Sequence, residues 1–166
     1  MKVLSKQRNS RTCFICGLDN PAGFRAPFYN MEDGSVVTPV LFKSEHQSFP
    51  GRVHGGLIAT IQDELGLRAI WAKKSEEFFG VTMSFEVKFR KPVPYGEPLF
   101  GRGILVRETP HFAVIETTLV DLEGRTLSNA EVKYILLPAE KISEGIDPHE
   151  ELYYLIEDGV KELAIR

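Results

Sequence analysis

The sequence predicts an α+β fold in which one antiparallel sheet packs against a single long helix. A stretch without proline, rich in Ala, Leu and Ile, runs from His54 to about Lys74 and is typical of a buried helix. Two short apolar runs precede it and four β-rich runs follow it, all separated by turn residues. Because no helical pattern separates successive strands of the second group, this order favours antiparallel pairing around one helix.

The composition is that of one ordinary globular domain. The 166 residues are 43% hydrophobic and 26% charged with a net charge of −3, which argues against a disordered chain and against a protein that coats nucleic acid. The longest stretch without Asp, Glu, Lys or Arg is Val53–Gln62, whereas a membrane-spanning helix needs about 20 residues. The first residues include no apolar segment of signal-peptide length, so we expect a cytoplasmic protein without membrane association.

Local signals place the elements up to the end of the helix. Residues 1–12 are polar and basic and are expected to form a flexible N-terminus. From Gly23 to Phe42, two apolar-alternating runs flank an Asp-Gly pair, which predicts a hairpin. The helix that follows ends in Lys73 and Lys74, whose charges suit the negative end of a helix dipole.

The first strand after the helix shows the clearest alternation. Apolar side chains recur at every second position from Val81 to Phe89, which puts Thr82 on the opposite, polar face. Pro92 and Pro94 end this strand because proline cannot continue a hydrogen-bonded ladder. Three further strands are predicted, at Pro98–Glu108, His111–Asp121 and Arg125–Leu137.

The predicted helix is apolar on two faces. At 100° per residue, an arc of about 120° holds Leu57, Ile58, Ile61, Leu65 and Ala69, which should pack on the sheet. The opposite face carries Ala59, Leu67 and Ile70 around Asp63. The second face needs another cover, most simply a second subunit, and the Asp63 carboxylate there is either satisfied at the interface or has a chemical task. Glu64 pairs with Arg68 at i+4 on what we expect to be a solvated edge.

The start of the helix is rich in glycine. Gly55 and Gly56 follow His54, and two glycines in a first turn indicate that something approaches the backbone closely. The N–H groups of a first turn have no intrahelical partner and bind carbonyl oxygens and anions. With a carboxylate nine residues after the histidine, the pattern predicts a site that polarises a carbonyl group.

Both cysteines lie in one motif, Cys13-Phe-Ile-Cys16-Gly17. The spacing is compatible with half a zinc site, a redox pair or a structural turn. Zinc normally takes four ligands, and the sequence contains no second CxxC or CxxH. Turn formers follow Gly17, where a thioredoxin-like motif would begin a helix. We therefore expect Cys13 and Cys16 to pack an N-terminal turn and predict no metal site.

Two segments resemble a known family. The string PGRVHGGLIATIQDE at 50–64, followed by VTMSFEVKFRKPVPYG at 81–96, is similar to the hotdog-fold acyl-CoA thioesterases, the superfamily of 4-hydroxybenzoyl-CoA and phenylacetyl-CoA thioesterases. The cysteine segment at 13–23 also resembles a subset of them. The resemblance implies a hotdog domain at 13–138, in which an antiparallel sheet wraps the helix, followed by an extension at 139–166.

The extension carries a helix signal of its own. Asp147 is a suitable N-cap and Pro148 suits the first helical position, so a terminal helix is predicted over 148–163. For the assembly, the resemblance implies a homodimer or homotetramer with active sites at the dimer interface. It implies an acyl-CoA substrate, no nucleic-acid partner and no cofactor.

The resemblance also implies roles for individual residues in the hydrolysis of acyl-CoA thioesters to free acid and coenzyme A. Asp63 matches the catalytic carboxylate, acting as general base or nucleophile. The N–H of Gly55, with Gly56 beside it, matches the donor that polarises the thioester carbonyl, and His54 matches the residue that supports it. Thr82 matches the residue that helps to hold the attacking water.

Two further positions complete the implied site. Arg90 and Lys91 match basic residues that meet the phosphates of coenzyme A. Some family members carry Asn or Gln about six residues before the histidine, where this chain has Ser48 with Gln47 and His46 alongside, so the side chain that assists carbonyl binding stays open.

Two other functions are compatible with the same fold. A non-catalytic acyl-CoA or fatty-acid binding protein, such as a sensor, would bind without turnover and use Asp63 structurally. A hotdog dehydratase or hydratase would act on the acyl chain and leave the thioester intact. The spacing from HGG to Asp63 resembles the thioesterase branch more closely.

Overall fold

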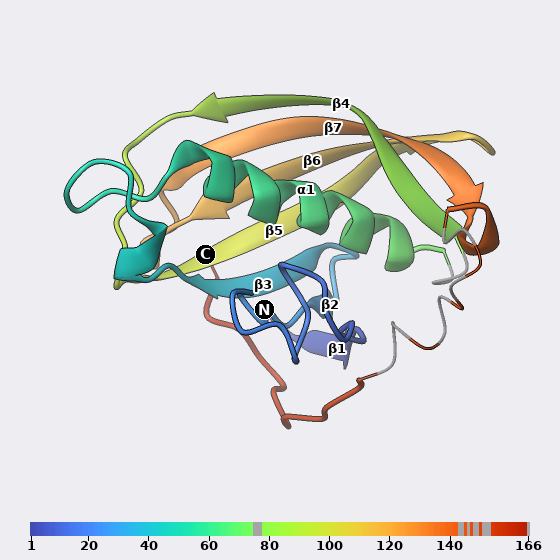
Figure 1. Cartoon of the computed structure of the whole chain (residues 1–166), viewed down its shortest axis with the longest axis horizontal. Coiled ribbons are helices and arrows are strands. Elements are labelled where there is room, and N and C mark those ends of the chain that lie inside the picture. The colour runs from blue at the N-terminus through green and yellow to red at the C-terminus, as the bar shows by residue number, and fades with distance from the viewer. Residues whose placement is uncertain (75–77, 143–144, 146, 148–149, 151–153, 166) are drawn as a thin grey trace.

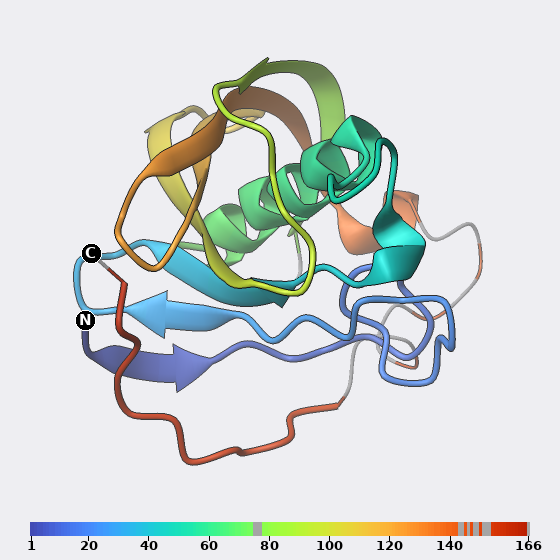
Figure 2. The same cartoon turned by 90° about the vertical axis from the view of Figure 1, so that its left-hand side faces the viewer.

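The computed structural model describes residues 1–74, 78–142, 145, 147, 150 and 154–165, and it contains one sheet and one long helix (Figure 1). Seven antiparallel strands follow the order β1-β2-β3-β5-β6-β7-β4. The sheet curves around the helix α1, which lies along its inner face (Figure 2). The predicted α+β class, with an antiparallel sheet around one helix, is confirmed.

The observed boundaries lie close to the predicted ones for the central elements. Helix α1 spans Gly55–Trp71, with His54 as its N-cap. The strands are β1 Val3–Lys6, β2 Tyr29–Met31, β3 Val36–Leu41, β4 Phe78–Phe89, β5 Pro98–Glu108, β6 Phe112–Val120 and β7 Thr126–Pro138. Short 3-10 turns cover Ser44–His46 and Ala139–Lys141. The described part of the chain contains no helix long and apolar enough to span a membrane.

Helix α1 packs closely on β5 because two residues of that strand lack side chains. Ile61 and Leu65 are fully buried in the main core. A Cβ at Gly101 would lie 2.6 Å from Leu65 Cδ1, and one at Gly103 would lie 2.7 Å from the Leu65 carbonyl oxygen. Ile70, on the same helix face as Asp63, also packs against the sheet, so at this position the second face is covered by the chain itself and not by a second subunit.

The segment expected to be a flexible N-terminus belongs to the sheet. Val3 is buried and β1 pairs antiparallel with β2. Further on, Gln7 and Asn9 are buried polar residues whose side chains donate to backbone carbonyls, Gln7 to that of Arg68 and Asn9 to that of Cys16. A polar composition predicted solvation, but the side-chain NH2 groups of both residues donate to backbone acceptors inside the fold, while Gln7 Oε1 has no hydrogen-bond partner among the described residues.

The C-terminal extension is not helical over 154–163. This part of the predicted helix runs extended beside β1, with bridges from Asn9 to Tyr154 and from Lys2 to Glu162 (Figure 2). Residues 148–149 and 151–153 of the prediction lie outside the described residues. Ile165 is buried in a small cluster with residues of β1 and β2, so docking on the sheet edge decides the conformation.

In the Glu64–Arg68 pair, Arg68 is buried and Glu64 is half-buried, which corrects the expected place of the pair on a solvated edge. Arg68 Nε lies 2.9 Å from Glu64 Oε1, and the Arg68 side chain is 1% exposed. The N-terminal segment covers the pair, and Arg68 Nη1 donates to the Arg8 carbonyl at 2.6 Å. The i,i+4 pairing was predicted correctly, but the segment that covers it comes from about 60 residues earlier in the chain.

Candidate functional site

The first turn of α1 presents a backbone donor. His54 caps the helix: its Nδ1 accepts from the Gly56 N–H at 3.0 Å, and its carbonyl accepts from Leu57 at 3.0 Å. No hydrogen bond from the Gly55 N–H to a described residue is found. This N–H therefore has the character of a carbonyl or anion donor at the positive end of the helix dipole.

A pocket of about 470 Å³ opens at this turn. Its wall includes Gly55 and Ile58 of α1 and the aromatic side chain of Phe89 at the end of β4. The polar part of the lining is cationic, formed by Arg52, Arg90 and Lys91. The structure thus brings the predicted basic pair to the same pocket as the predicted Gly55 donor, with Ser48 also on its wall.

Asp63 lies on the face of α1 nearest the edge strand β4. Its Oδ1 accepts from the Thr82 hydroxyl at 2.8 Å and from the Tyr134 hydroxyl at 3.2 Å. Tyr134 is 1% exposed, and its single hydroxyl hydrogen is shared between this oxygen and the Asp63 carbonyl, which lies closer at 2.6 Å. Burial raises the pKa of Tyr134 and the Asp63 carboxylate raises it further, so the phenol stays protonated and acts as donor. Two hydroxyls thus fix one oxygen of a half-buried carboxylate.

Thr82 reaches Asp63 because β4 contains a bulge. Thr82 pairs with Tyr134 of β7, but Ser84 pairs with Lys133, so Met83 is an extra residue in the ladder. A bulge breaks the alternation of side chains, and the continuous alternation predicted from Val81 to Phe89 is therefore wrong at its start. Thr82 faces the helix, and not the polar side of the sheet.

The two halves of the predicted site are separated along α1. Gly55 and Asp63 are eight residues apart in one helix, which corresponds to about 12 Å at 1.5 Å per residue. A nucleophile and an oxyanion donor act on one carbonyl group, within about 3 Å of the reacting atoms. One chain alone therefore does not bring Asp63 and its own Gly55 to the same thioester.

Sequence reasoning missed two contributors. Tyr134 lies 71 positions after Asp63, and only the pairing of β4 with β7 brings it near the carboxylate. Arg52 had a detectable signal, because it lies two residues before His54 within the glycine-rich motif. The predicted cation Arg90 also has a structural partner, since its Nε donates to Asn129 Oδ1 at 2.8 Å.

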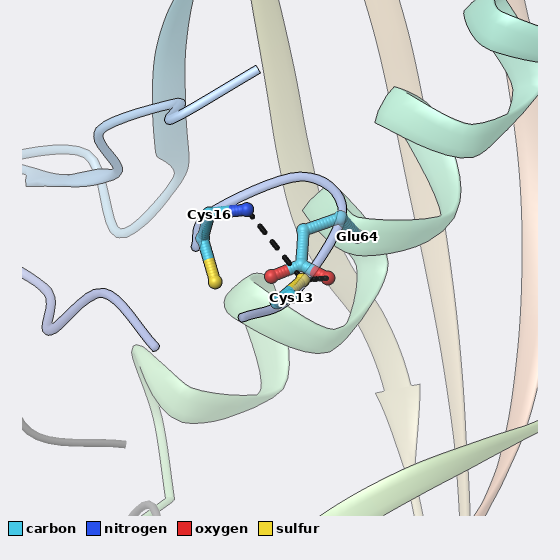
Figure 3. Close-up of side chains that lie close together, drawn as sticks. All are labelled: Cys13, Cys16 and Glu64. Atoms are coloured by element: carbon cyan, nitrogen blue, oxygen red, sulfur yellow. Dashed lines mark hydrogen bonds between the residues drawn. The ribbon is translucent and has the colours of Figure 1, made fainter. Parts of the chain in front are cut away.

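The cysteines pack the N-terminal turn as expected, but a carboxylate lies beside them. Cys16 is 1% exposed in the main core, and Cys13 is packed against that core. Cys13 Sγ lies 4.0 Å from Glu64 Oε2 (Figure 3). A hydrogen bond from Cys16 is the main reason that the pKa of Cys13 is lowered to about 6.

Comparison with protein families matches residues 50–128 to the thioesterase superfamily. The matched segment contains α1 and the strands β4, β5 and β6. It therefore includes all of the predicted catalytic and basic residues, whereas Tyr134 and the two cysteines lie outside it. A comparison with curated protein sequences gave no match.

Solved structures share the fold. One of them, a thioesterase superfamily protein, is 24% identical to this chain and superposes with a TM-score of 0.68. The aligned region covers 75% of this chain but only 60% of that protein's length. A thioesterase from Haemophilus influenzae is 12% identical with a TM-score of 0.66, and the alignment covers 74% of this chain and 85% of the Haemophilus chain. A Bacillus halodurans protein solved with CoA is 19% identical with a TM-score of 0.62, and the alignment covers 70% of this chain and 76% of that protein.

Proposed function

We propose that this chain is a member of the hotdog-fold thioesterase superfamily and that it hydrolyses acyl-CoA thioesters to a free acid and coenzyme A. The observation that carries the proposal is the anchored carboxylate of Asp63, held on one oxygen by Thr82 and Tyr134. A thioester carbonyl is strongly electrophilic and a thiolate leaves without strong acid assistance. One base or nucleophile and one oxyanion donor are therefore sufficient chemistry.

In the proposed mechanism, Asp63 activates a water molecule or attacks the carbonyl carbon directly. Thr82 and Tyr134 occupy Oδ1, which leaves Oδ2 for the water or the substrate. Thr82, which donates to Asp63, would also help to hold that water, the role that the family resemblance implies. The Gly55 N–H stabilises the developing oxyanion, and His54 keeps the first turn in place by accepting from Gly56.

We propose that each active site is built from two chains, in a homodimer or a dimer of dimers. The separation of about 12 Å between Gly55 and Asp63 along α1 requires it if both act on one carbonyl. Strand β4 supports this assembly, because it is an edge strand with Val81, Met83 and Phe89 between 42% and 53% exposed. An exposed apolar edge strand is a template for pairing with another chain.

Coenzyme A would bind at the pocket beside Gly55. Arg52, Arg90 and Lys91 give this pocket its positive charge, and Phe89 and Ile58 give it apolar surface. Guanidinium and ammonium groups bind phosphate through charge-assisted hydrogen bonds. The Bacillus halodurans protein solved with CoA supports the same ligand class here.

The central experiment replaces Asp63 with Asn. Free coenzyme A is quantified by HPLC over a panel of short, medium, long and aromatic acyl-CoAs, which avoids interference from the two protein thiols. We expect D63N to lower kcat by about 10²–10⁴-fold, the usual contribution of general base catalysis, and to leave the fold unchanged. The matched control is E116Q, which removes the exposed carboxylate of Glu116 in β6 and should keep wild-type activity.

The outcomes separate the candidate functions. Wild-type turnover by D63N would reject Asp63 as the catalytic group. Tight acyl-CoA binding by the wild-type protein without release of coenzyme A would instead identify a binding protein. Acyl-chain modification without thiol release would identify a dehydratase or hydratase.

A pair of variants tests the oxyanion donor. Gly55 is the first helical residue, where proline is well tolerated, and the His54 backbone at φ −64° and ψ 131° is compatible with a following proline. G55P therefore removes the N–H and keeps the helix. G55A keeps the N–H but places the same Cβ about 3.3 Å from Phe89 Cζ. We expect kcat of G55P to be about 10²–10³-fold below that of G55A, and equal rates would reject the assignment.

A further inference from the structure

We propose that Cys13, Cys16 and Glu64 form a binding site for a zinc-class divalent metal ion, a site separate from the proposed thioester chemistry. One ligand atom from each residue lies within 4.8 Å of the other two. The sulfurs come from the N-terminal loop and the carboxylate from the middle of α1 (Figure 3). Zn²⁺ binds thiolate sulfur at about 2.3 Å and carboxylate oxygen at about 2.0–2.2 Å, so the three groups need to move inward only slightly.

The loop holds the sulfurs in the arrangement that a metal needs. The N–H groups of Ile15 and Cys16 point at Cys13 Sγ, at 3.3 Å and 3.5 Å. Such N–H contacts favour the thiolate form, which is the metal ligand. Gly17 closes the turn by donating to the Cys13 carbonyl at 2.8 Å, and a Cβ at Gly17 would overlap that carbonyl. The loop conformation is therefore fixed by its own backbone.

Glu64 is oriented by a buried cation. Arg68 Nε donates to Glu64 Oε1 at 2.9 Å, which directs Oε2 toward Cys13. The Arg68 guanidinium lies 4.6 Å from the ring centre of Phe28 and 4.7 Å from that of Trp71, so it is firmly held. Carboxylates that bind metals are commonly positioned by such an outer hydrogen bond.

The charges of the cluster balance when a divalent ion is bound. Two thiolates and one carboxylate carry three negative charges, and the metal with Arg68 carries three positive charges. Zn²⁺ binding displaces to solvent any protons that remain on the two sulfurs and forms two metal–sulfur bonds and one metal–oxygen bond. A neutral cluster suits this location because Arg68 and Cys16 are each 1% exposed.

The ligand set favours zinc over the hard cations. Thiolates select Zn²⁺ and related transition metals, whereas Mg²⁺ and Ca²⁺ take oxygen ligands. Three protein ligands leave the fourth tetrahedral position to a water molecule, and the half-buried Cys13 allows solvent to reach it. A disulfide between the two cysteines would make no use of Glu64, and the aligned carboxylate is the reason to prefer a metal. The third ligand is 48 residues from Cys16, so cysteine and histidine spacing did not reveal it.

The test measures metal directly in the full-length chain. Zinc content is determined by mass spectrometry after purification in reductant without an affinity tag that binds metal. The metal-free chain is then titrated with Co²⁺, whose thiolate charge-transfer absorption reports sulfur ligation, and Zn²⁺ is added in competition. We expect one equivalent of metal and a cobalt spectrum with two thiolates. C13S and C16S should each remove one thiolate from that spectrum.

E64Q tests the third ligand, with E116Q as the matched control. Removing a residue that only hydrogen-bonds to a metal ligand already changes metal affinity by about 10–100-fold. Loss of the ligand itself in E64Q should therefore lower the affinity for Zn²⁺ at least tenfold, while E116Q should leave this affinity unchanged. Equal affinities of E64Q and E116Q, or no stoichiometric metal and no charge-transfer band, would overturn the proposal. A mass loss of two hydrogens under these reducing conditions would identify a disulfide instead. D63N should bind metal normally, so failure of the proposed hydrolysis leaves this result interpretable.

Discussion

At the scale of single residues, the orientation of Asp63 depends on two hydroxyl groups from different strands. Thr82 approaches from β4 and Tyr134 from β7, and both donate to the same carboxylate oxygen. Hydrogen bonds to charged groups contribute about 1.5–3 kcal/mol, more than neutral ones. If Asp63 acts as base or nucleophile, these contacts set the direction in which its other oxygen points.

We expect T82V to lower kcat by roughly 10–100-fold with little change in KM, which corresponds to the loss of one such hydrogen bond. Valine keeps the shape and the strand preference of threonine. T82S retains the hydroxyl and should stay within a few-fold of wild type, and T118V on β6 controls for a threonine change elsewhere in the sheet. Steady-state kinetics with an acyl-CoA that the wild type hydrolyses gives both constants. A T82V rate equal to that of T118V would contradict the positioning role.

The sequence predicted the residues of this site that depend on one helix. Gly55 and Asp63 follow from spacing along α1, and that spacing is local. Tyr134 could not be found, because its contact depends on the register of β4 against β7. The inward direction of Thr82 could not be derived from alternation either, because a bulge is a property of strand pairing. Its role came from family resemblance alone.

At the scale of elements, the C-terminal segment acts as a strap across the outer edge of the sheet. Asp158 accepts from Lys6 Nζ at 2.8 Å and from the Tyr29 hydroxyl at 2.6 Å. Val3 donates to the Lys161 carbonyl at 2.8 Å, which extends the contact along β1. The strap is therefore held by one ionic cluster, a few backbone hydrogen bonds and the apolar contacts of the buried Ile165.

The strap should loosen in acid. Burial opposes ionisation of Asp158, but the hydrogen bonds from Lys6 and Tyr29 outweigh it and lower its pKa from 3.8 to about 2. A carboxylate with a depressed folded-state pKa stabilises the docked state above its unfolded pKa, and this contribution is lost as the pH falls from about 4 to about 2. Proteolysis by an acid-stable protease should cut the segment faster over this range.

D158N removes the charge at every pH. We expect it to show fast cleavage already at pH 5 and a flatter pH dependence than the wild type. Asp121, which pairs with Arg125 in the turn between β6 and β7, provides the control D121N. A strap whose cleavage in D158N follows the wild-type profile would show that the ionic cluster does not hold it.

The central elements were predictable and the terminal ones were not. Proline-bounded alternation located β5, β6 and β7 within about two residues, because a half-buried strand has a strong period of two. The helix signal lay earlier, at Asp147 and Pro148, and residues 154–165 show little periodicity, so nothing local indicated that this segment docks extended on β1. The same holds for β1 itself, whose four residues are stabilised by strands far along the chain.

At the scale of the whole molecule, the proposed active site is divided between two chains. The separation of Gly55 and Asp63 along α1 and the exposed apolar edge of β4 lead to this arrangement by independent routes. A divided site makes a specific prediction for mixed dimers, because the two substitutions can fall in the same site.

A heterodimer of D63N and G55P, isolated through two different affinity tags, should regain about half of wild-type activity, since one site carries both substitutions and the other carries neither. Each variant homodimer should be inactive. Acyl-CoA hydrolysis and molar mass in solution are measured on the same samples. An inactive heterodimer of correct mass would mean that each chain completes its own site.

The bulge at Met83 decides which side chains of β4 face the helix. Because Thr82 pairs with Tyr134 and Ser84 with Lys133, removing the extra residue would leave these two pairs adjacent in a regular ladder, and Thr82 would keep its direction toward α1. Closing the bulge at unchanged chain length would instead shift the first part of the strand by one residue and turn Thr82 to the opposite face of the sheet. Homologous chains with one residue fewer here should therefore keep this hydroxyl contact, and an alignment that hides the gap will match Thr82 to a residue that faces away from the helix.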